Sequence, residues 1–357
     1  MGSRLLVATR KGLFTFERAR GGWRPTARAF LGDPVTMVLA DPRDGACYAG
    51  LRHGHFGPKL HRSEDGVTWT EIGTPSFPEA AEGEERPSVD TIWSLEHGGV
   101  DRPGVLWLGT VPGALFRSED RGDTWSLCES LWNQPNRPNW FGGGYDKPGI
   151  HSICVDPRDS RRLLVAVSCA GVWQTADDGL TWEQTAHGME ADYMPPELAL
   201  DPDSQDPHRV VRCPVAPDRL WAQHHCGVFQ SVNGGRQWTR VVLPGSSFGF
   251  AVAVHPRDPD TAWFVPAVKD EHRIPVDGRL VVARTRDGGA TFDLLGDGLP
   301  QQDAYDLVYR HSLDVAEDGA TLAFGSTTGN LWISESSGER WEIVSHHLPP
   351  VYAVRFA

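Results

Sequence analysis

The sequence lacks the features of membrane, disulfide-rich and nucleic-acid-binding proteins. No stretch approaches the roughly 18–20 uninterrupted apolar residues of a membrane-spanning helix, and residues 1–11 lack the apolar region and cleavage site of a signal peptide. The six cysteines are scattered without a CxxC pair, which indicates reduced thiols in a cytoplasmic protein. Lys and Arg number 34 against 47 Asp and Glu, a formal charge of −13, so neither nucleic acid nor an anionic membrane is an expected partner.

Turn-forming residues and tryptophan are abundant instead. The 357 residues include 39 Gly, 27 Pro and 14 Trp, which favours many short strands over long helices. One pattern recurs: a hydroxyl residue, an Asp or Asn (Ser in the last copy), a Gly and a final aromatic that lies 49–57 residues after the aromatic of the previous copy. Its clear copies occupy residues 62–69, 118–125, 175–182, 231–238, 285–292 and 334–341, and a degenerate copy ends at Trp23. Seven copies therefore fill the chain, as in a repeat architecture.

Each copy makes physical sense as a β-turn between two strands. The hydroxyl and carboxylate groups can hydrogen-bond nearby backbone N–H groups, and the glycine tolerates a positive φ. The surrounding frame predicts four short strands per repeat, which is the content of one propeller blade. We therefore predict an all-β, single-domain, seven-bladed β-propeller over residues 1–357, with approximate blades at 1–30 plus 350–357, 34–75, 90–131, 149–187, 208–243, 247–297 and 304–347.

The two ends of the chain predict how the ring closes. Residues 5–8 start the first repeat at its second strand, and residues 351–356 supply a first strand that nothing follows. One blade is therefore expected to combine both ends, which leaves no open sheet edge.

The turns resemble the Asp-box (BNR) repeats of sialidase and sortilin-type propellers. The copies at 118–125, 175–182 and 285–292 match the pattern S/T-x-D-x-G-x-T-W/F fully. The whole chain is also similar to stand-alone bacterial BNR-repeat proteins, through residues 53–61, 140–145 and 223–229. This resemblance implies a sialidase-like or glycosyl-hydrolase-like protein and, as a partner, a small ubiquitin-like sulfur-carrier protein. The repeats themselves are structural turns and define no activity.

The expected site lies at the axial end of the ring opposite these turns, where the long loops gather. Aligning the innermost strands places Trp93, His151 and His311 at matching positions, together with Thr36, Val211, Phe250 and Tyr352. Such a ring predicts a pocket with aromatic walls and a few polar groups, as small-molecule sites have.

Candidate residues follow from this placement. Imidazole, amine and carboxylate groups can move protons, and cationic groups can hold a carboxylate or phosphate. The catalytic candidates are His151, His224, Lys269 and Glu271. The substrate-binding candidates are His53, Lys59, Trp93, Trp140, Tyr145, Phe250 and Arg310.

Histidines from separate blades also allow a metal hypothesis. Imidazoles suit iron, copper or zinc, although no HExxH or CxxC spacing is present. The candidate ligands are His53, His55, His151, His224 and His311.

Three functional interpretations remain open. The first is a hydrolase that acts on a small polar or anionic molecule in the axial pocket. The second is a metal-dependent enzyme built on the same histidines, and the third is a non-catalytic scaffold for a peptide or protein. True sialidase activity is not expected, because that chemistry needs a Tyr–Glu nucleophile pair and the sequence shows no clear one.

Overall fold

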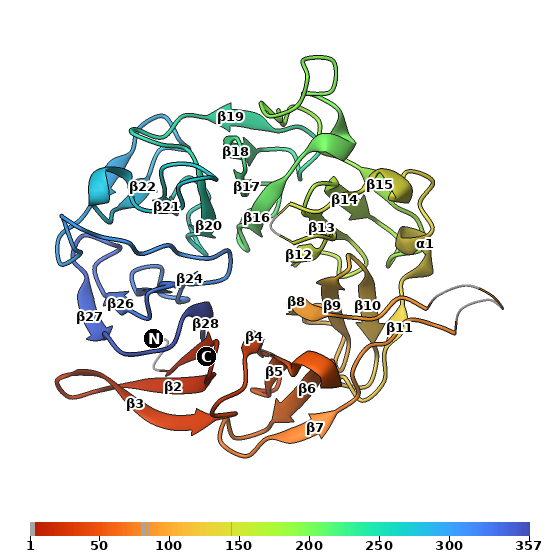
Figure 1. Cartoon of the computed structure of the whole chain (residues 1–357), viewed down its shortest axis with the longest axis horizontal. Coiled ribbons are helices and arrows are strands. Elements are labelled where there is room, and N and C mark those ends of the chain that lie inside the picture. The colour runs from red at the N-terminus through yellow and green to blue at the C-terminus, as the bar shows by residue number, and fades with distance from the viewer. Residues whose placement is uncertain (1–3, 80–82, 84–85, 144) are drawn as a thin grey trace.

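Seven four-stranded antiparallel sheets surround a central axis in the computed structural model (Figure 1). The structure describes residues 4–79, 83, 86–143 and 145–357. Residues 1–3 of the first predicted blade, and Gly144 within the stretch 140–145 that supports the resemblance, lie outside the described residues. The predicted all-β, seven-bladed propeller is confirmed.

Each blade is a meander, and six of the seven use four consecutive strands. The first blade contains β28 (Val351–Phe356), β1 (Arg4–Thr9), β2 (Gly12–Ala19) and β3 (Gly22–Ala29). The second and third contain β4 (Val35–Ala40), β5 (Cys47–Arg52), β6 (Pro58–Ser63), β7 (Thr70–Ile72), β8 (Thr91–His97), β9 (Leu106–Val111), β10 (Leu115–Ser118) and β11 (Ser126–Leu127). The fourth and fifth contain β12 (Ile150–Val155), β13 (Leu163–Val167), β14 (Gly171–Thr175), β15 (Glu183–Gln184), β16 (Pro207–Arg212), β17 (Leu220–His224), β18 (Gly227–Ser231) and β19 (Thr239–Val241). The sixth and seventh contain β20 (Gly249–Val254), β21 (Ala262–Pro266), β22 (Val282–Thr285), β23 (Asp293–Leu295), β24 (Leu313–Val315), β25 (Leu322–Gly325), β26 (Leu331–Ser334) and β27 (Glu342–Ser345).

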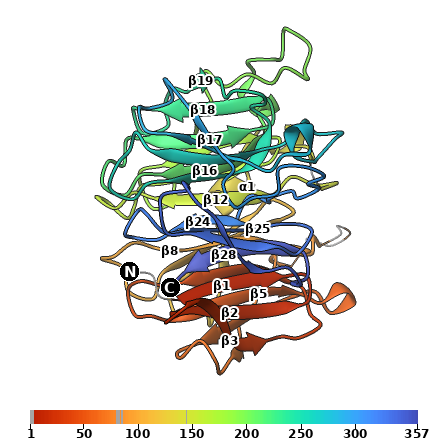
Figure 2. The ribbon, with the colours of Figure 1, turned by 90° about the vertical axis from the view of Figure 1, so that its left-hand side faces the viewer.

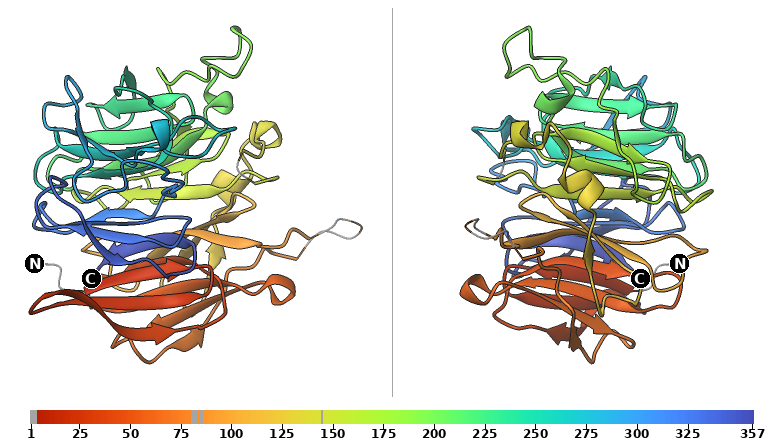
Figure 3. Two further views of the ribbon diagram at one scale, coloured as in Figure 1. Left: turned by 60° about the vertical axis from the view of Figure 1, so that its left-hand side comes forward. Right: turned by 90° about the vertical axis from the view of Figure 1, so that its right-hand side faces the viewer.

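Helical segments in the described residues are short and lie in the connections between strands. They are α1 (Glu129–Trp132) and the 3-10 turns η1 (Gly54–Phe56), η2 (Arg137–Asn139), η3 (Pro202–Ser204) and η4 (Val276–Gly278). None of these helices is both long and apolar enough to cross a membrane. The connection from β15 to β16 stands out from the rim of the ring (Figure 3).

The first blade joins both ends of the chain. Strand β28 pairs antiparallel with β1, from Leu5 opposite Phe356 to Ala8 opposite Ala353. Figure 2 shows β28 beside β1, with both marked chain ends on the same side of the molecule. The predicted closure by the C-terminal strand is confirmed, and the edge of β1 is fully paired.

The repeated turns connect the two outer strands of six blades, and each is fixed by its own side chains. In the turn after β14, the Thr175 hydroxyl donates to Asp177 Oδ1 (2.7 Å) and accepts from the Gly179 N–H (3.0 Å). The Thr181 N–H and hydroxyl donate to the same Asp177 carboxylate at 2.9 and 2.6 Å. The turns at 118–125 and 285–292 repeat this network. Hydrogen bonds from side chains within the turn itself therefore fix the hairpin.

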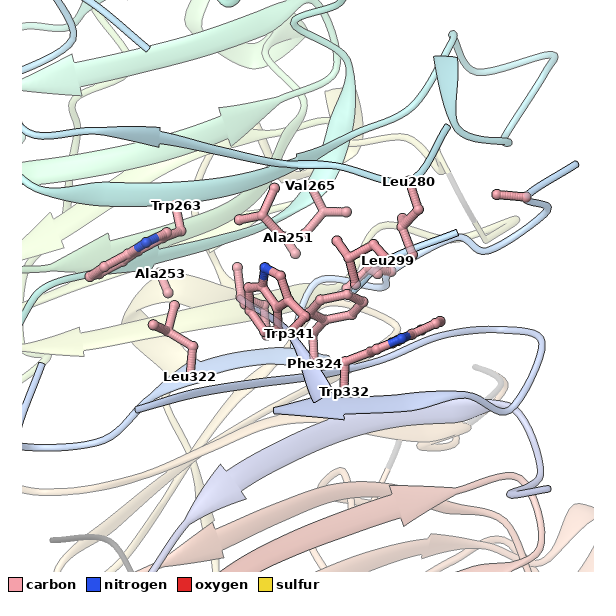
Figure 4. Close-up of a cluster of buried hydrophobic side chains, with 14 residues drawn as sticks. Ala251, Ala253, Trp263, Val265, Leu280, Leu299, Leu322, Phe324, Trp332 and Trp341 are labelled. Carbon is pink, nitrogen blue, oxygen red and sulfur yellow. The ribbon is translucent and has the colours of Figure 1, made fainter. Parts of the chain in front are cut away.

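The core lies between neighbouring blades rather than inside one sheet. Figure 4 shows side chains of the sixth and seventh blades pointing toward one another, among them Trp263, Phe324, Trp332 and Trp341. Small residues of β20, Ala251 and Ala253, leave room for these rings. Repetition of this interface around the ring buries the tryptophans that follow the turns at 231–238 and 334–341.

A β-bulge recurs near the start of the innermost strands. The pairing register shifts across Thr36 in β4, Trp93 in β8, His151 in β12 and His208 in β16. The same irregularity lies at Phe250–Ala251 in β20 and at Tyr352 in β28. Because a bulge re-aims the extra side chain, these residues gather at one end of the axis.

One position differs from the predicted alignment. In β16 the bulge falls on His208 and not on Val211. Since β16 begins at Pro207, Val211 lies near the other end of the strand and lines a hollow there with Arg212 and Val254.

Candidate functional site

A pocket of about 600 Å³ opens at the end of the axis where the bulges gather. Its described lining combines cations with aromatic rings and contains no Asp or Glu. The cations are Arg10, Arg52, Arg273 and Arg310, and the rings include Trp93, Tyr145, Phe250, Tyr309 and Tyr352. The arginines come from the β1–β2 turn, the end of β5, the β21–β22 loop and the residues just before β24. The pocket is therefore positively charged within an acidic protein.

Arg310 is the most enclosed of these cations. Its side chain is only 8% exposed, and its Cζ lies 4.8 Å from the centre of the Trp93 ring and 5.1 Å from that of Phe250. Among the described residues, Nε of Arg310 has no hydrogen-bond partner and no carboxylate lies within ion-pair distance of the guanidinium. Burial lowers the pKa of Arg310, against the opposing charge of Asp206. The structure thus holds a cation between two aromatic faces without neutralising it.

The other arginines are more exposed or already paired. Arg52 Nη2 lies 2.9 Å from Asp90 Oδ1, and Arg273 Nη2 lies 2.5 Å from Asp270 Oδ1. The Arg273 guanidinium also covers the Phe250 ring at 5.3 Å. All four arginines line the pocket, and Arg310 is the buried one among them.

Two of the predicted histidines lie at or beside the pocket. His311 lines it, and neither ring nitrogen has a hydrogen-bond partner among the described residues. His151 lies behind Trp93, with ring centroids 5.5 Å apart, and its Nδ1 is 3.0 Å from the Ser152 hydroxyl. Burial lowers the pKa of both imidazoles well below the ordinary value, so both are neutral near pH 7.

Seven of the residues expected from the sequence therefore line one pocket: Thr36, Trp93, Tyr145, Phe250, Arg310, His311 and Tyr352. Within it, Tyr145 packs edge-on against Trp93, with ring centroids 5.1 Å apart.

Other predicted residues lie elsewhere on the surface. His53 and Lys59 line a separate hollow beside Phe56, where Lys59 Nζ is 2.8 Å from Glu71 Oε1. His55 is exposed in η1. Lys269 and Glu271 are exposed and pair with each other, Nζ to Oε2, at 3.3 Å.

Trp140 and His224 are buried in packing positions. Trp140 packs against Trp173, with ring centroids 5.6 Å apart, and the Arg137 guanidinium covers it at 4.6 Å. His224 Nε2 and Nδ1 each lie 3.0 Å from a backbone nitrogen, of Asp206 and Cys226 respectively. Burial lowers the pKa of His224 to about 3.

Sequence reasoning missed one buried polar group beside the pocket. Asp206 Oδ2 lies 3.5 Å from His208 Nε2 and 3.5 Å from His225 Nδ1. The ring of His208 stacks on Phe250, with centroids 4.4 Å apart. Aligning His208, rather than Val211, with His151 and His311 would have revealed this group from the sequence.

The fold and pocket together define a seven-bladed propeller with a cationic, aromatic axial pocket, and comparisons with known proteins agree on the fold. No family model matches the chain. The xyloglucanase Xgh74A of Acetivibrio thermocellus is 32% identical over 80 residues, which cover 22% of this chain and 9% of that protein. A probable oligoxyloglucan-reducing end-specific xyloglucanase of Neosartorya fischeri is 26% identical over 190 residues, or 51% of this chain and 20% of that protein. The matched regions therefore span at most a fifth of these two relatives' length.

Solved structures give the same architecture at low identity. An ancestral GH74 enzyme superposes with a TM-score of 0.62 at 15% identity, covering 86% of this chain and 38% of that one. YCF48 bound to D1 peptide gives 0.52 at 14% identity, covering 94% and 87%. YCF48 from Cyanidioschyzon merolae gives 0.54 at 12% identity, covering 88% and 87%. At these identities the likeness is one of fold.

Proposed function

We propose that the axial pocket binds a small organic anion, a carboxylate attached to a planar or apolar body. The observation that carries this proposal is Arg310, a buried guanidinium held between Trp93 and Phe250 with no carboxylate partner among the described residues. A guanidinium in such a place presents a planar fork that matches a carboxylate. Its attraction for an anion is strengthened by the low local dielectric.

The rest of the pocket supports the same ligand chemistry. Arg10 adds a further cation to the lining, Arg52 and Arg273 add guanidinium groups that are paired with Asp90 and Asp270, and the aromatic rings offer faces for a planar body. A volume of about 600 Å³ falls within the roughly 300–1,000 Å³ of small-molecule sites. The ligand is therefore expected to place its charge on Arg310 and its body against the aromatic lining of the pocket.

Glycoside hydrolysis is the second candidate, favoured by the local similarity to xyloglucanases. Most glycosidases use two carboxylates that flank the scissile bond. The described lining supplies none, and Asp90 beside it is paired with Arg52. We therefore expect the purified protein to release no reducing sugar from xyloglucan. Measurable release would support glycoside hydrolysis in place of the proposed anion binding.

Isothermal titration calorimetry tests the binding proposal. The probes are 4-hydroxybenzoate, N-acetylneuraminate, inorganic phosphate and one short peptide with a free or an amidated C-terminus. We expect a carboxylate to bind, and Arg310→Lys to weaken it about 10- to 100-fold, since a charge-assisted hydrogen bond contributes about 1.5–3 kcal/mol. Preference for the free-acid peptide would identify a peptide terminus as the ligand, in keeping with the scaffold interpretation.

The matched control is Arg286→Lys, which changes an exposed arginine paired with Glu339. It should bind the probe like the parent protein. Equal affinity of the Arg310→Lys variant, with its fold intact by circular dichroism, would refute the proposal, as would failure of every anion to bind. The sulfur-carrier partner and the cytoplasmic location stay predictions.

A further inference from the structure

We propose that Asp206, His208 and His225 bind a divalent metal ion of the zinc type. Among the residues that the structure describes, this is the one group of three His, Cys, Asp or Glu side chains whose donor atoms all lie within 4.8 Å of one another. It lies where the long β15–β16 connection returns to the axis, and none of its members lines the axial pocket. The inference is therefore independent of the proposed anion binding.

The spacing of the donor atoms fits a tetrahedral site. Asp206 Oδ2 is 3.5 Å from both His208 Nε2 and His225 Nδ1. Two ligands about 2.1 Å from a tetrahedral zinc ion lie about 3.4 Å apart. The carboxylate is thus already at ligand spacing from both imidazoles, and the two imidazole donors lie within 4.8 Å of each other.

The hydrogen bonding of His208 directs an electron pair into the group. Its Nδ1 lies 2.6 Å from the carbonyl oxygen of Gly249, and a carbonyl only accepts, so Nδ1 carries the hydrogen. In the neutral imidazole Nε2 then presents a lone pair toward the Asp206 carboxylate. Two electron pairs that face each other need a cation between them, either a metal ion or a proton on Nε2.

Hydrogen bonds and ring stacking orient the side chains of Asp206 and His208, as the residues around the ligands of a metal site do. The other carboxylate oxygen of Asp206 accepts from the Ser168 hydroxyl (3.2 Å) and the Cys169 N–H (3.3 Å). The stacked contact with Phe250 fixes the ring of His208. Carbonyl and amide partners of this kind orient metal ligands and raise their affinity.

Gly143 packs closely against the proposed metal site. Gly143 is exposed, yet a side-chain carbon added there would lie 3.2 Å from Asp206 Oδ2 and 2.8 Å from Cys169 Sγ. The backbone of Gly143 thus lies so close to the Asp206 carboxylate and the Cys169 thiol that a side chain at this position would disturb the group. His225 is a quarter exposed, so the group lies just below the surface.

The donor set selects the class of metal. Two imidazoles and one carboxylate suit zinc and other first-row divalent ions, whereas magnesium and calcium prefer oxygen ligands. Three protein ligands leave a coordination position for water or another molecule. These ligands differ from the five histidines proposed from the sequence. The sequence pattern marked neither Asp206 nor the bulge that brings His208 next to it.

The test uses the full chain, stripped with a chelator and titrated with Zn²⁺ against a chromophoric competitor. We expect one zinc ion per chain, and at least about 100-fold weaker binding in Asp206→Asn and in His225→Gln, the upper end of what loss of an outer-shell partner causes. Asp206→Asn keeps an oxygen for Ser168 and Cys169 while it removes the charge. The control is His187→Gln, an exposed histidine outside the group, which should bind zinc like the parent.

Two results would overturn the inference. One is no zinc binding by the parent chain beyond that of the Asp206→Asn variant, in which case a proton on His208 bridges the pair. The other is full retention of zinc by both folded variants. Gly143→Val gives a separate check, because a bulky side chain over the carboxylate should slow or weaken zinc binding without removing a ligand.

Discussion

A single carboxylate fixes four of the six repeated turns, and Asp177 shows how. The hydroxyl and N–H of Thr181 and the hydroxyl of Thr175 all donate to its carboxylate, and they lower the pKa of Asp177 from 3.8 to about 2. The folded chain stabilises the ionised carboxylate more strongly than the unfolded chain does. The contribution of Asp177 to the stability of the fold is therefore complete above about pH 4. It disappears as the pH falls toward 2.

The variant Asp177→Asn tests this account. Asn233 occupies the same position in the turn at 231–238 and accepts from the Gln237 N–H at 3.0 Å, so an amide preserves the turn. We expect the variant to be less stable than the parent at about pH 6, and the difference to shrink between about pH 4 and pH 2. Urea-unfolding midpoints across that range measure it, with Glu183→Gln, an exposed carboxylate of the same hairpin, as the control. A difference that is constant with pH would exclude the ionised carboxylate as the cause.

At the scale of strands, hydroxyl groups beside the bulges join neighbouring blades. The Ser152 hydroxyl accepts from the Val210 N–H at 3.0 Å, and the Ser94 hydroxyl donates to the Ile150 carbonyl at 2.9 Å. These bonds link β16 to β12 and β12 to β8 around the axis. The inner strands thus form a ring held by side chains as well as by packing.

We expect Ser152→Ala to destabilise the fold by about 1–3 kcal/mol, since it leaves a buried N–H of Val210 without its acceptor. Denaturant unfolding measures the loss, and Ser88→Ala, an exposed serine, should change little. If Ser152→Ala unfolds like the parent, the hydroxyl does not join the two blades.

The strands and turns could be predicted from the sequence because their chemistry is local. The hydroxyl, carboxylate and glycine of residues 175–182 lie within one turn, so their spacing alone predicts the hairpin. The bulge at His208 depends on where β16 begins after a long connection. Aligning the predicted inner strands with one another placed Val211 at this position instead, because the spacing of the repeats does not fix the first residue of β16.

Only the part of the candidate site that belongs to the repeating pattern could be predicted from the sequence. The bulged residues Trp93 and Phe250 belong to the repeating frame, so their approach to the axis could be expected. Lys269 and Glu271 lie in the β21–β22 loop, and their mutual ion pair depends on the direction in which that loop folds. Asp206 precedes its strand by one residue, and nothing in the repeat marks it.

At the scale of the whole molecule, β28 holds the ring together from two sides. It pairs with β1 in the first blade, and its Arg355 reaches Glu96 of the third blade at 2.7 Å and Asp314 of the seventh at 3.9 Å. One strand therefore joins the first blade to both a neighbouring blade and a more distant one.

Removal of residues 351–357 should open the ring. The buried edge of β1, including Leu6 and Val7, would become an unpaired edge prone to association. We expect the shortened chain to aggregate or to lose its single cooperative unfolding transition, as judged by size-exclusion chromatography and thermal denaturation. Removal of Ala357 alone is the control, because it keeps every β1–β28 pair. A monomeric truncated chain that unfolds like the parent would show that β28 is dispensable.

The pairing of β1 with β28 also has a consequence for synthesis. The two strands lie more than 340 residues apart along the chain, so at about 5–20 residues per second a ribosome makes the second roughly 20–70 s after the first. Throughout that time the nascent chain carries an apolar strand whose partner does not yet exist. Later blades can form in order as they emerge, whereas the first blade made is the last that can be completed.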